Sequence, residues 1–404
     1  MYRSTIARAR YHRLAAALMV GAFCVLAGGP SPAIADPARG NAITVGTDSF
    51  RRPPADLSSL SPGQIVGSRA VTPAMDGKWI PGVRGWQISF RSNDTHRQPI
   101  LAITTLIVPV TAWAGPGARP VVSLQMAYDS ADPQCAPSVS MATSSGNFMP
   151  YLNRNWAVAV PDHEGPRAAF MAGVSGGHVV LDGVRAVRAF TASGIGAGNP
   201  WVLDGESGGA QPTAWAAQLQ PTYAPELRFA GAAVGGLPAD PAVVARNLDG
   251  NPFSGLMFAA LAGIAGEHPE AGIEAMLNAQ GKQMLRAVRT SCDPVTRYPL
   301  RKLSEYSNVS DPISQPDPAA ALATHILGKL PPTMPIFDYH GMLDEVVPVA
   351  QDDATVHAWC TRGARVHIRR TSFTEHITDY LLNHDAAVQY LIDRIDNKPV
   401  PNDC

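Results

Sequence analysis

Charge and cysteine are both scarce in this chain of 404 residues. Charged residues make up 16% of the sequence and the formal net charge is -1, so the basic excess on which nucleic-acid binders depend is missing. After the first 35 residues no run of 18 apolar residues occurs, which argues against a later transmembrane helix. No Cys-x-x-Cys pair or cysteine/histidine cluster has zinc spacing, so the sequence predicts no metal site and gives no sign of a cofactor.

Apolar residues, in contrast, are plentiful. Hydrophobic residues make up 46% of the chain, enough to fill a large core, and the low charge density excludes a disordered protein. The 36 glycines and 36 prolines indicate many turns and long connections. The length fits two or three small domains, or one large α/β domain with an insertion.

The N-terminus has the three parts of a secretory signal. Four arginines within the first 13 residues precede an apolar stretch, 14–27, and Ala33-Ile34-Ala35 fits a cleavage site before Asp36. The alternative, an N-terminal membrane anchor, would have an apolar core too short to span a bilayer comfortably. We therefore expect residues 1–35 to be a signal peptide and 36–404 to form a secreted, extracellular protein.

Cysteine content fits export. Cys24 falls within the expected signal peptide, which leaves four cysteines in the exported chain. An even number of cysteines in an exported protein predicts disulfides, here two. The four remaining cysteines are Cys135, Cys292, Cys360 and Cys404. They allow three pairings, and the residues alone leave all three open.

Apolar runs and helical patterns alternate along most of the chain. Residues 36–80 look loop-like, and the polar turn 93–96 separates two expected strands, 87–90 and 100–108. Further strands are expected at 121–126, 156–160, 201–203, 229–234, 336–339 and 365–369, and helices at 177–191, 209–219, 349–360 and 377–395. This alternation predicts an α/β fold, a mostly parallel sheet with helices on both faces. Residues 240–331 break the rhythm and predict a helical insertion.

A nucleophile elbow follows one of these strands. Gly205-Glu206-Ser207-Gly208-Gly209 matches Gly-x-Ser-x-Gly between a strand and a helix, the setting in which a tight turn exposes the serine hydroxyl. The turn also directs the backbone N–H of Gly208 toward an oxyanion. A second match, 173–177, lacks a preceding strand, so we expect its Ser175 to lie in the first turn of a helix.

A serine nucleophile needs a base and an orienting carboxylate. Asp344 lies in the loop after the strand 336–339, and His376 lies between the last strand and the last helix, which gives the order Ser, Asp, His of α/β-hydrolases. The weaker alternatives for the acid and the base are Glu345, Asp338, His340, His367 and His384.

Several motifs in sequence order resemble the secretory lipase family of the α/β-hydrolases. They are 48–69, Tyr128-Asp129-Ser130, 160–166, the elbow with 215–219 and 223–227, His340-Gly341 with 344–348, and His376. Together they span roughly residues 46 to 395. One departure is Glu206, where the family more often has tyrosine.

The resemblance implies an α/β-hydrolase fold and a triad of Ser207, Asp344 and His376. It also implies an oxyanion hole formed by Gly208 and Asp129, and a cap at 240–331 that carries the acyl-binding surface. The disulfide pairing that it implies is Cys135–Cys292 and Cys360–Cys404.

The expected function is hydrolysis of acylglycerols or other lipid esters, the chemistry of a triacylglycerol lipase or carboxylic ester hydrolase, through an acyl-enzyme on Ser207. The expected partners are a lipid or small ester and a lipid–water interface, and not nucleic acid. The alternatives are a soluble short-chain esterase, an acyltransferase or peptidase on the same fold, and a non-catalytic lipid-binding relative. The segment 255–264 is apolar on every side. We expect it to be either a helix buried in the core of the cap or a helix with one face that lines the acyl site or meets the lipid surface.

Overall fold

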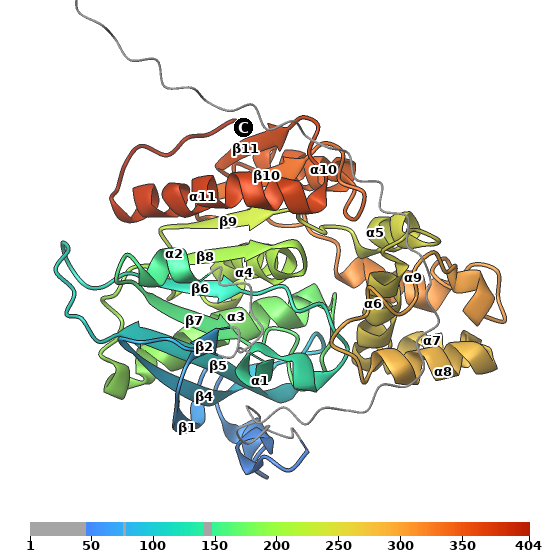
Figure 1. Ribbon diagram of the computed structural model, residues 1–404, viewed down its shortest axis with the longest axis horizontal. Coiled ribbons are helices and arrows are strands. Elements are labelled where there is room, and N and C mark those ends of the chain that lie inside the picture. Colours follow the sequence, from blue (N-terminus) through green and yellow to red (C-terminus); the bar gives the residue numbers. More distant parts are fainter. Residues whose placement is uncertain (1–45, 76–77, 141–147) are drawn as a thin grey trace, which may run out of the picture. The chain divides into compact units, whose positions relative to one another are not determined.

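A nine-stranded mixed sheet runs through the part of the chain that the computed structural model describes, residues 46–75, 78–140 and 148–404. Its order is β1-β4-β5-β7-β6-β8-β9-β10-β11 (Figure 1). The first three pairings are antiparallel and the other five are parallel. The strands are β1 (Ile65–Val71), β4 (Val83–Asn93), β5 (Pro99–Pro109), β6 (Val121–Gln125), β7 (Ala157–Pro161), β8 (Trp201–Glu206), β9 (Gly231–Gly235), β10 (Ile336–Gly341) and β11 (Val366–Thr371). The expected mostly parallel sheet is confirmed.

The central strands were predictable because they are buried along their whole length. Every residue of β6, β7, β9 and β10 is buried, so these strands appear in the sequence as predominantly apolar runs. The expectation that residues 36–80 form only loops is wrong. β1 is an edge strand whose residues are at most partly buried, so its sequence lacks such a run. The same segment contributes to a two-stranded sheet of β2 (Ala74–Met75) and β3 (Lys78–Trp79).

Helices cover both faces of the sheet, as expected. On one face Trp215 and Trp359 pack into a core built with α3 (Gly173–Ala189), α4 (Ala210–Tyr223) and α10 (Val349–Cys360). On the other face Tyr151 and Leu391 pack from α2 (Met149–Leu152) and α11 (His376–Ile395). The other short elements outside the insertion are η1 (Ser49–Arg51), η2 (Leu57–Ser59), η3 (Pro133–Cys135), α1 (Pro137–Ser140), η5 (Thr191–Ser193) and η6 (Ser207–Gly209).

The insertion (residues 240–331) is helical and lies between the neighbouring strands β9 and β10. Figure 1 shows its helices gathered at one side of the sheet. They pack on a separate apolar core that includes Phe258, Leu285 and Val288. Its elements are α5 (Pro241–Leu248), α6 (Ser254–Glu267), η7 (Pro269–Ala271), α7 (Ile273–Met276), α8 (Ala279–Val288), η8 (Leu303–Tyr306) and α9 (Pro316–Thr324).

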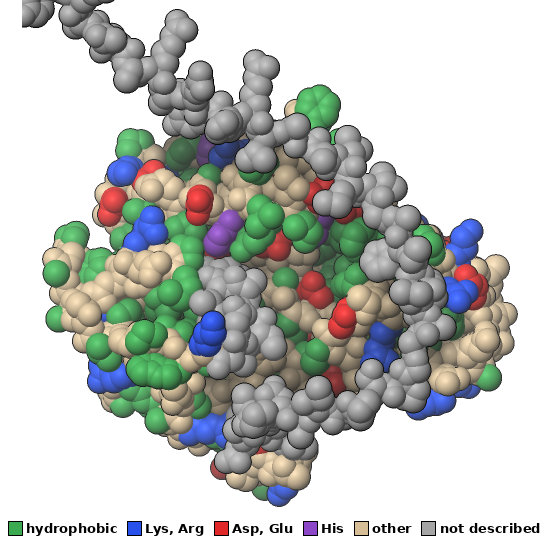
Figure 2. Space-filling model, viewed as in Figure 1, with side chains coloured by type: hydrophobic (Ala, Val, Ile, Leu, Met, Phe, Trp, Pro, Cys, Tyr) green, Lys and Arg blue, Asp and Glu red, His purple; other side chains and the backbone are tan. Residues whose placement is uncertain are grey.

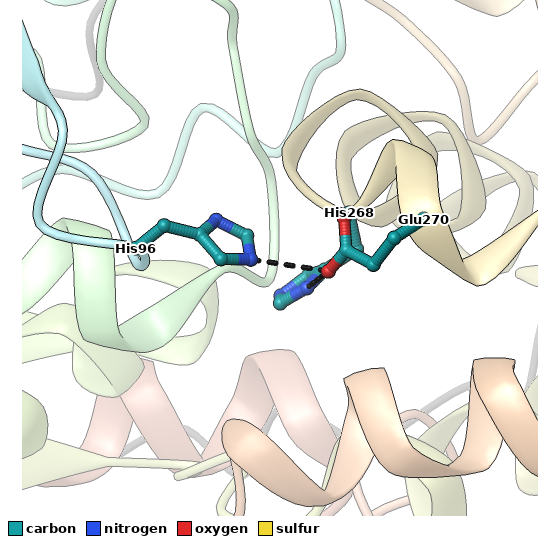
Figure 3. Close-up of side chains that lie close together, drawn as sticks. All are labelled: His96, His268 and Glu270. Carbon is teal, nitrogen blue, oxygen red and sulfur yellow. Dashed lines mark hydrogen bonds and ion pairs between the residues drawn. The ribbon is translucent and has the colours of Figure 1, made fainter.

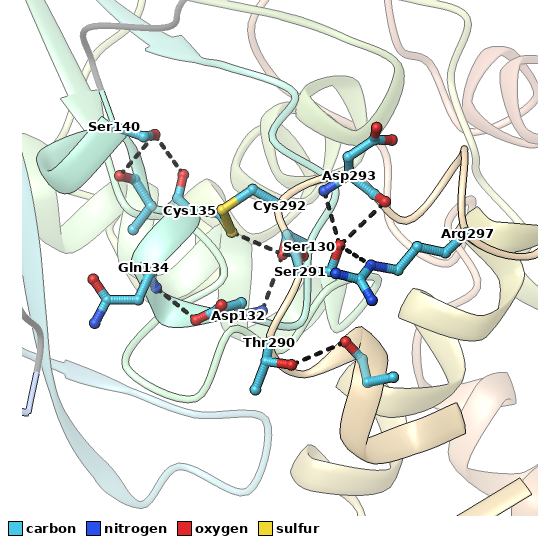
Figure 4. Close-up of a disulfide and its surroundings, with 12 residues drawn as sticks. Ser130, Asp132, Gln134, Cys135, Ser140, Thr290, Ser291, Cys292, Asp293 and Arg297 are labelled. Atoms are coloured by element: carbon cyan, nitrogen blue, oxygen red, sulfur yellow. Dashed lines mark hydrogen bonds between the residues drawn. A yellow bond between two sulfur atoms is a disulfide. The ribbon is translucent and has the colours of Figure 1, made fainter. Parts of the chain in front are cut away.

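Two disulfides join distant segments. Cys135 bonds to Cys292 across 157 residues and so ties the segment after β6 to the insertion (Figure 4). In the chain-entropy model a loop of that size contributes about 5 kcal/mol. Beside this bond, Ser130 Oγ donates to the carbonyl of Ser291 at 2.8 Å. Cys360 bonds to Cys404 and so ties α10 to the end of the chain. This is the pairing that the family resemblance implied.

The expected signal peptide, residues 1–35, lies outside the described residues. In the part that the structure does describe, no helix is both long enough and apolar enough to cross a membrane.

Candidate active site

Ser207 sits on a strained turn between β8 and α4. Its φ is +53°, a left-handed conformation that costs free energy for a residue with a Cβ. Gly205 lies so close to the next turn of chain that a Cβ there would overlap the carbonyl of Gly209 and the hydroxyl of Thr213. The strand, the strain and the close approach together are the geometry of a nucleophile elbow.

His376 lies between Ser207 and Asp344. Its Nε2 is 2.8 Å from Ser207 Oγ and its Nδ1 is 2.6 Å from Asp344 Oδ2. The other oxygen of Asp344 accepts the backbone N–H groups of Val346 and Val347 at 2.9 and 2.7 Å. The expectation that His376 lies in a loop is wrong by one residue, because it is the first residue of α11.

Burial and pairing set the charges of this group. Burial alone would raise the pKa of the Asp344 carboxyl, but hydrogen bonds from His340 and His376 outweigh it and hold that pKa below its usual range. Burial alone would lower the pKa of His376, but the hydrogen bond to Asp344 outweighs it and the pKa is raised. Asp344 is therefore ionised at neutral pH and stabilises the imidazolium form of His376.

Gly208 and Asp129 lie together beside Ser207. Asp129 follows β6 in a loop with φ +43°, and its Oδ1 lies where a Cβ on Gly208 would stand. Burial raises the pKa of the Asp129 carboxyl to about 6. Both residues line one cavity with Ser207. Gly208 of the elbow and Asp129 of the loop after β6 are therefore neighbours at the wall of the cavity that Ser207 also lines.

The alternative residues have other partners than the Ser207 hydroxyl and the His376 ring. Ser175 is buried in α3 rather than on a turn. His367 Nδ1 lies 2.7 Å from Asp403 in the C-terminal tail, and His384 Nε2 lies 3.4 Å from Asp204. Asp338 pairs with Arg370 inside the sheet, and Glu345 accepts the backbone N–H of His376 at 3.2 Å.

Comparison with known proteins identifies the family. The secretory lipase family model matches residues 136–403. The chain belongs to the secretory lipase family. The secreted triacylglycerol lipase LIP1 of Malassezia furfur is 31% identical over 380 residues, which cover 88% of this chain and 77% of that protein. A probable inactive lipase, MT1628 of Mycobacterium tuberculosis, is 30% identical over 371 residues, 87% of this chain and 83% of that protein.

A solved structure agrees with this assignment. Candida antarctica lipase A in its closed state superposes with a TM-score of 0.83 at 27% identity, covering 89% of this chain and 88% of that one. The fold of this secretory lipase is therefore that of the α/β-hydrolases. The chain is a secreted ester hydrolase of the lipase and esterase class.

A second histidine of this secretory lipase contacts Asp344. His340 Nε2 lies 3.1 Å from Asp344 Oδ2, and its Nδ1 lies 2.8 Å from Asp352. Burial would lower the pKa of His340, but hydrogen bonds to Asp344 and Asp352 outweigh it and raise the pKa to about 10. The sequence offered His340 as a weaker alternative for the base. The structure places it behind Asp344, where it contacts the same carboxylate oxygen as His376. The spacing of four residues to Asp344 was the only signal of this contact.

Glu206 lies on the other side of His376. One of its carboxylate oxygens is 3.6 Å from Nε2, the nitrogen that also contacts Ser207. Burial raises the pKa of Glu206 to about 7. The sequence marked this position only as a departure from the family, and the structure makes Glu206 a neighbour of His376.

An apolar cavity leads from Ser207 into the insertion. Leu256, Met257 and Ala260 of α6 line it together with Ser207. A second apolar cavity shares Met257 and Ala260 with the first and extends between α6, α7 and α9. Ala259 and Ala262 are instead packed in the core. In the segment 255–264, one face thus lines the cavity and the rest is buried in the core.

Proposed function

We propose that Ser207 is the nucleophile, His376 the general base and Asp344 the orienting carboxylate of this secretory lipase. The observation that carries the proposal is the placement of His376 within hydrogen-bond distance of both Ser207 and Asp344. As Ser207 Oγ attacks the ester carbonyl carbon, Nε2 of His376 takes its proton. The backbone N–H groups of Gly208 and Asp129 then stabilise the oxyanion.

Collapse of this intermediate breaks the ester bond. The leaving alcohol takes the proton from His376, and the acyl group stays on Ser207. Water then attacks the acyl-enzyme, with His376 again accepting a proton, and the carboxylic acid leaves with Ser207 restored. The ionised Asp344 stabilises the imidazolium in both halves of the reaction.

The acyl chain would occupy the cavity that starts at Ser207. Its lining beyond Asp129 and Ser207 is apolar, and the connected second cavity is lined by side chains such as Ile264, Ile273 and Leu322. An apolar lining that reaches from Ser207 to residues of α7 and α9 favours medium or long acyl chains over short ones. Each methylene that the cavity buries stabilises the bound ester by about 0.8 kcal/mol. We therefore favour acylglycerols, the substrate class in the names of several relatives, over the short-chain alternative.

A lipid–water interface is the proposed physical partner. Exposed apolar side chains surround His376 on the loops after β10 and β11 and on the first turns of α11. Figure 2 shows hydrophobic side chains exposed in this region. The residues are Met342, Leu343, Phe373, Ile377 and Leu381. Backbone N–H groups of Met342 and Leu343 donate to the carbonyls of Thr371 and Thr374, which holds the loop after β10 beside the loop after β11.

The domain boundaries are part of the same proposal. Residues 1–35 would be removed during export, 36–404 would form the catalytic domain, and the insertion would act as a cap over the acyl site. The cavity between α5, α6 and the elbow supports this role for the insertion.

A chain-length series tests the proposal. Rates with p-nitrophenyl esters from acetate to palmitate are measured for the wild type and for Ala260→Trp, which would fill the shared part of the cavities. We expect the wild type to prefer longer chains and Ala260→Trp to shift toward acetate. Ala259→Trp is the matched control. Ala259 is fully buried in an apolar cluster that includes Phe170, so a tryptophan there should destabilise the protein and lower the rates with all esters alike. An unchanged preference in Ala260→Trp would contradict the acyl site.

A further inference from the structure

A second histidine cluster, which shares no residue with the candidate active site, joins the insertion to the turn between β4 and β5 (Figure 3). His96 belongs to that turn, His268 follows α6, and Glu270 lies in η7. Glu270 Oε1 lies 3.1 Å from Nε2 of His96 and 2.8 Å from Nδ1 of His268. We propose that these three side chains bind a divalent transition-metal ion, with Zn²⁺ as the best fit.

The three ligand atoms need little movement to surround a metal. They already lie within 4.8 Å of one another. Zinc bonds of about 2.0–2.2 Å in tetrahedral geometry place ligand atoms roughly 3.3 Å apart. The side chains of His96 and Glu270 are 42% and 59% exposed and can adjust, whereas that of His268 is only 3% exposed and serves as the fixed ligand.

Neighbouring groups hold both sides of the cluster in position. Nε2 of His268 lies 2.8 Å from Nε2 of the buried His325, which orients the ring. The backbone N–H of His96 donates to Asp94 at 2.9 Å, and that of Thr95 donates to Glu267 at 2.7 Å. Outer contacts of this kind orient the ligands in natural metal sites.

The chemistry of the ligands selects the metal. Two imidazoles and one carboxylate suit zinc and its neighbours better than calcium or magnesium, which prefer oxygen ligands. Asp94 and Glu267 also lie near His96, but Arg167 contacts their carboxylates at 3.1 and 2.6 Å and offsets part of their negative charge. Three protein ligands leave a coordination position for water.

A metal here would cross-link two parts of the protein. His96 comes from the turn between β4 and β5, and His268 and Glu270 directly follow α6, the helix that lines the cavity at Ser207. Sequence spacing did not reveal this group, because His96 and Glu270 are 174 residues apart. The bound ion would stabilise the protein and hold the insertion against the sheet.

The test measures binding and stability in the untagged, EDTA-treated protein. Calorimetric titration with ZnCl₂ should show one equivalent bound, and the melting temperature should rise with added Zn²⁺ and fall back with chelator. His96→Asn and Glu270→Gln should each weaken binding by at least about tenfold, with the metal-free melting temperature nearly unchanged. His268 is left intact, since its replacement inside the protein would risk the fold.

His367→Asn is the matched control. His367 also contacts a carboxylate, Asp403 at 2.7 Å, on the surface but without a third ligand, so this variant should bind Zn²⁺ like the wild type. No saturable binding to the wild type at about 100 µM Zn²⁺, some ten times above a weak 10 µM site, would overturn the proposal. Binding that survives both His96→Asn and Glu270→Gln would overturn it as well.

Discussion

Two segments of this protein have the same pattern, Gly-x-Ser-Gly-Gly, at 173–177 and 205–209. In the second, Ser207 ends a strand on a turn with positive φ, and its hydroxyl meets a histidine. In the first, Ser175 is buried within a helix. The same sequence pattern therefore occurs in two different local structures.

The glycines explain the difference. At 173–177 they let α3 approach α4 closely, since a Cβ on Gly177 would lie 2.9 Å from the backbone of Trp215 and one on Gly173 would overlap its indole ring. At 205–209 they let the chain turn sharply beneath Ser207. Glycine thus serves helix packing in one segment and a strained turn in the other, and only the preceding strand distinguishes the two.

The serines give the largest expected contrast. Ser207→Ala should lower kcat at least about 10,000-fold, because only binding and the oxyanion hole would remain. Ser175→Ala should stay within about twofold of the wild type. The measurement is the rate of ester hydrolysis by both variants, and circular dichroism checks that both are folded. An inactive Ser175→Ala beside an active Ser207→Ala would reverse our assignment.

The carboxylate behind the base gives the next contrast. Asp344→Asn should reduce kcat by roughly 100- to 10,000-fold, since His376 would lose the charge that stabilises its imidazolium form. Asp338→Asn is the control, because Asp338 is also buried but pairs with Arg370 and does not contact His376. Equal losses of kcat per folded molecule in the two variants would argue against a specific role for Asp344.

The glycine that follows each serine offers a smaller contrast. A Cβ on Gly208 would collide with the Asp129 carboxylate and come within 3.1 Å of Phe170, so Gly208→Ala should lower kcat about tenfold or more. A Cβ on Gly176 would meet Pro212 Cβ at 3.0 Å, which costs at most about 1–3 kcal/mol of stability. Melting curves and kcat for both variants separate the effects. A loss of kcat in a Gly176→Ala variant that is still folded would contradict the assignment of Gly176 to helix packing alone.

The residue before each serine gives the smallest expected effect. The carboxylate of Glu206 helps raise the pKa of His376, although less than Asp344 does. Removing its negative charge in Glu206→Gln should lower that pKa and move the acid limb of kcat/KM to lower pH by less than about one unit. The shift is small because the pKa of Glu206 is itself raised to about 7, so the group is only partly charged near neutrality. Val174→Ala, at the equivalent position of α3, should leave the pH profile unchanged, and a shift toward higher pH in Glu206→Gln would contradict this account.

Much of the fold was readable from local patterns. Buried parallel strands such as β7 and β9 are continuous apolar runs, and the strand before Ser207 with the loop after β10 pointed to Ser207 and Asp344. Edge strand β1 was missed because a half-exposed strand has no such run. Patterns of this kind work because they depend on burial and backbone geometry over a few residues.

The sequence by itself determined the sheet's buried strands, the helical nature of the insertion and the number of cysteines available for pairing, and it pointed to Ser207, Asp344 and His376 as candidate site residues. Only the tertiary structure decided that His340 lies behind Asp344, that Ala260 rather than Ala259 faces the cavity, and that His96 meets His268 and Glu270. The physical reason is the distance along the sequence between the residues that interact. Local periodicity follows from neighbours along the chain, whereas contacts between segments more than a hundred residues apart depend on how the whole core packs.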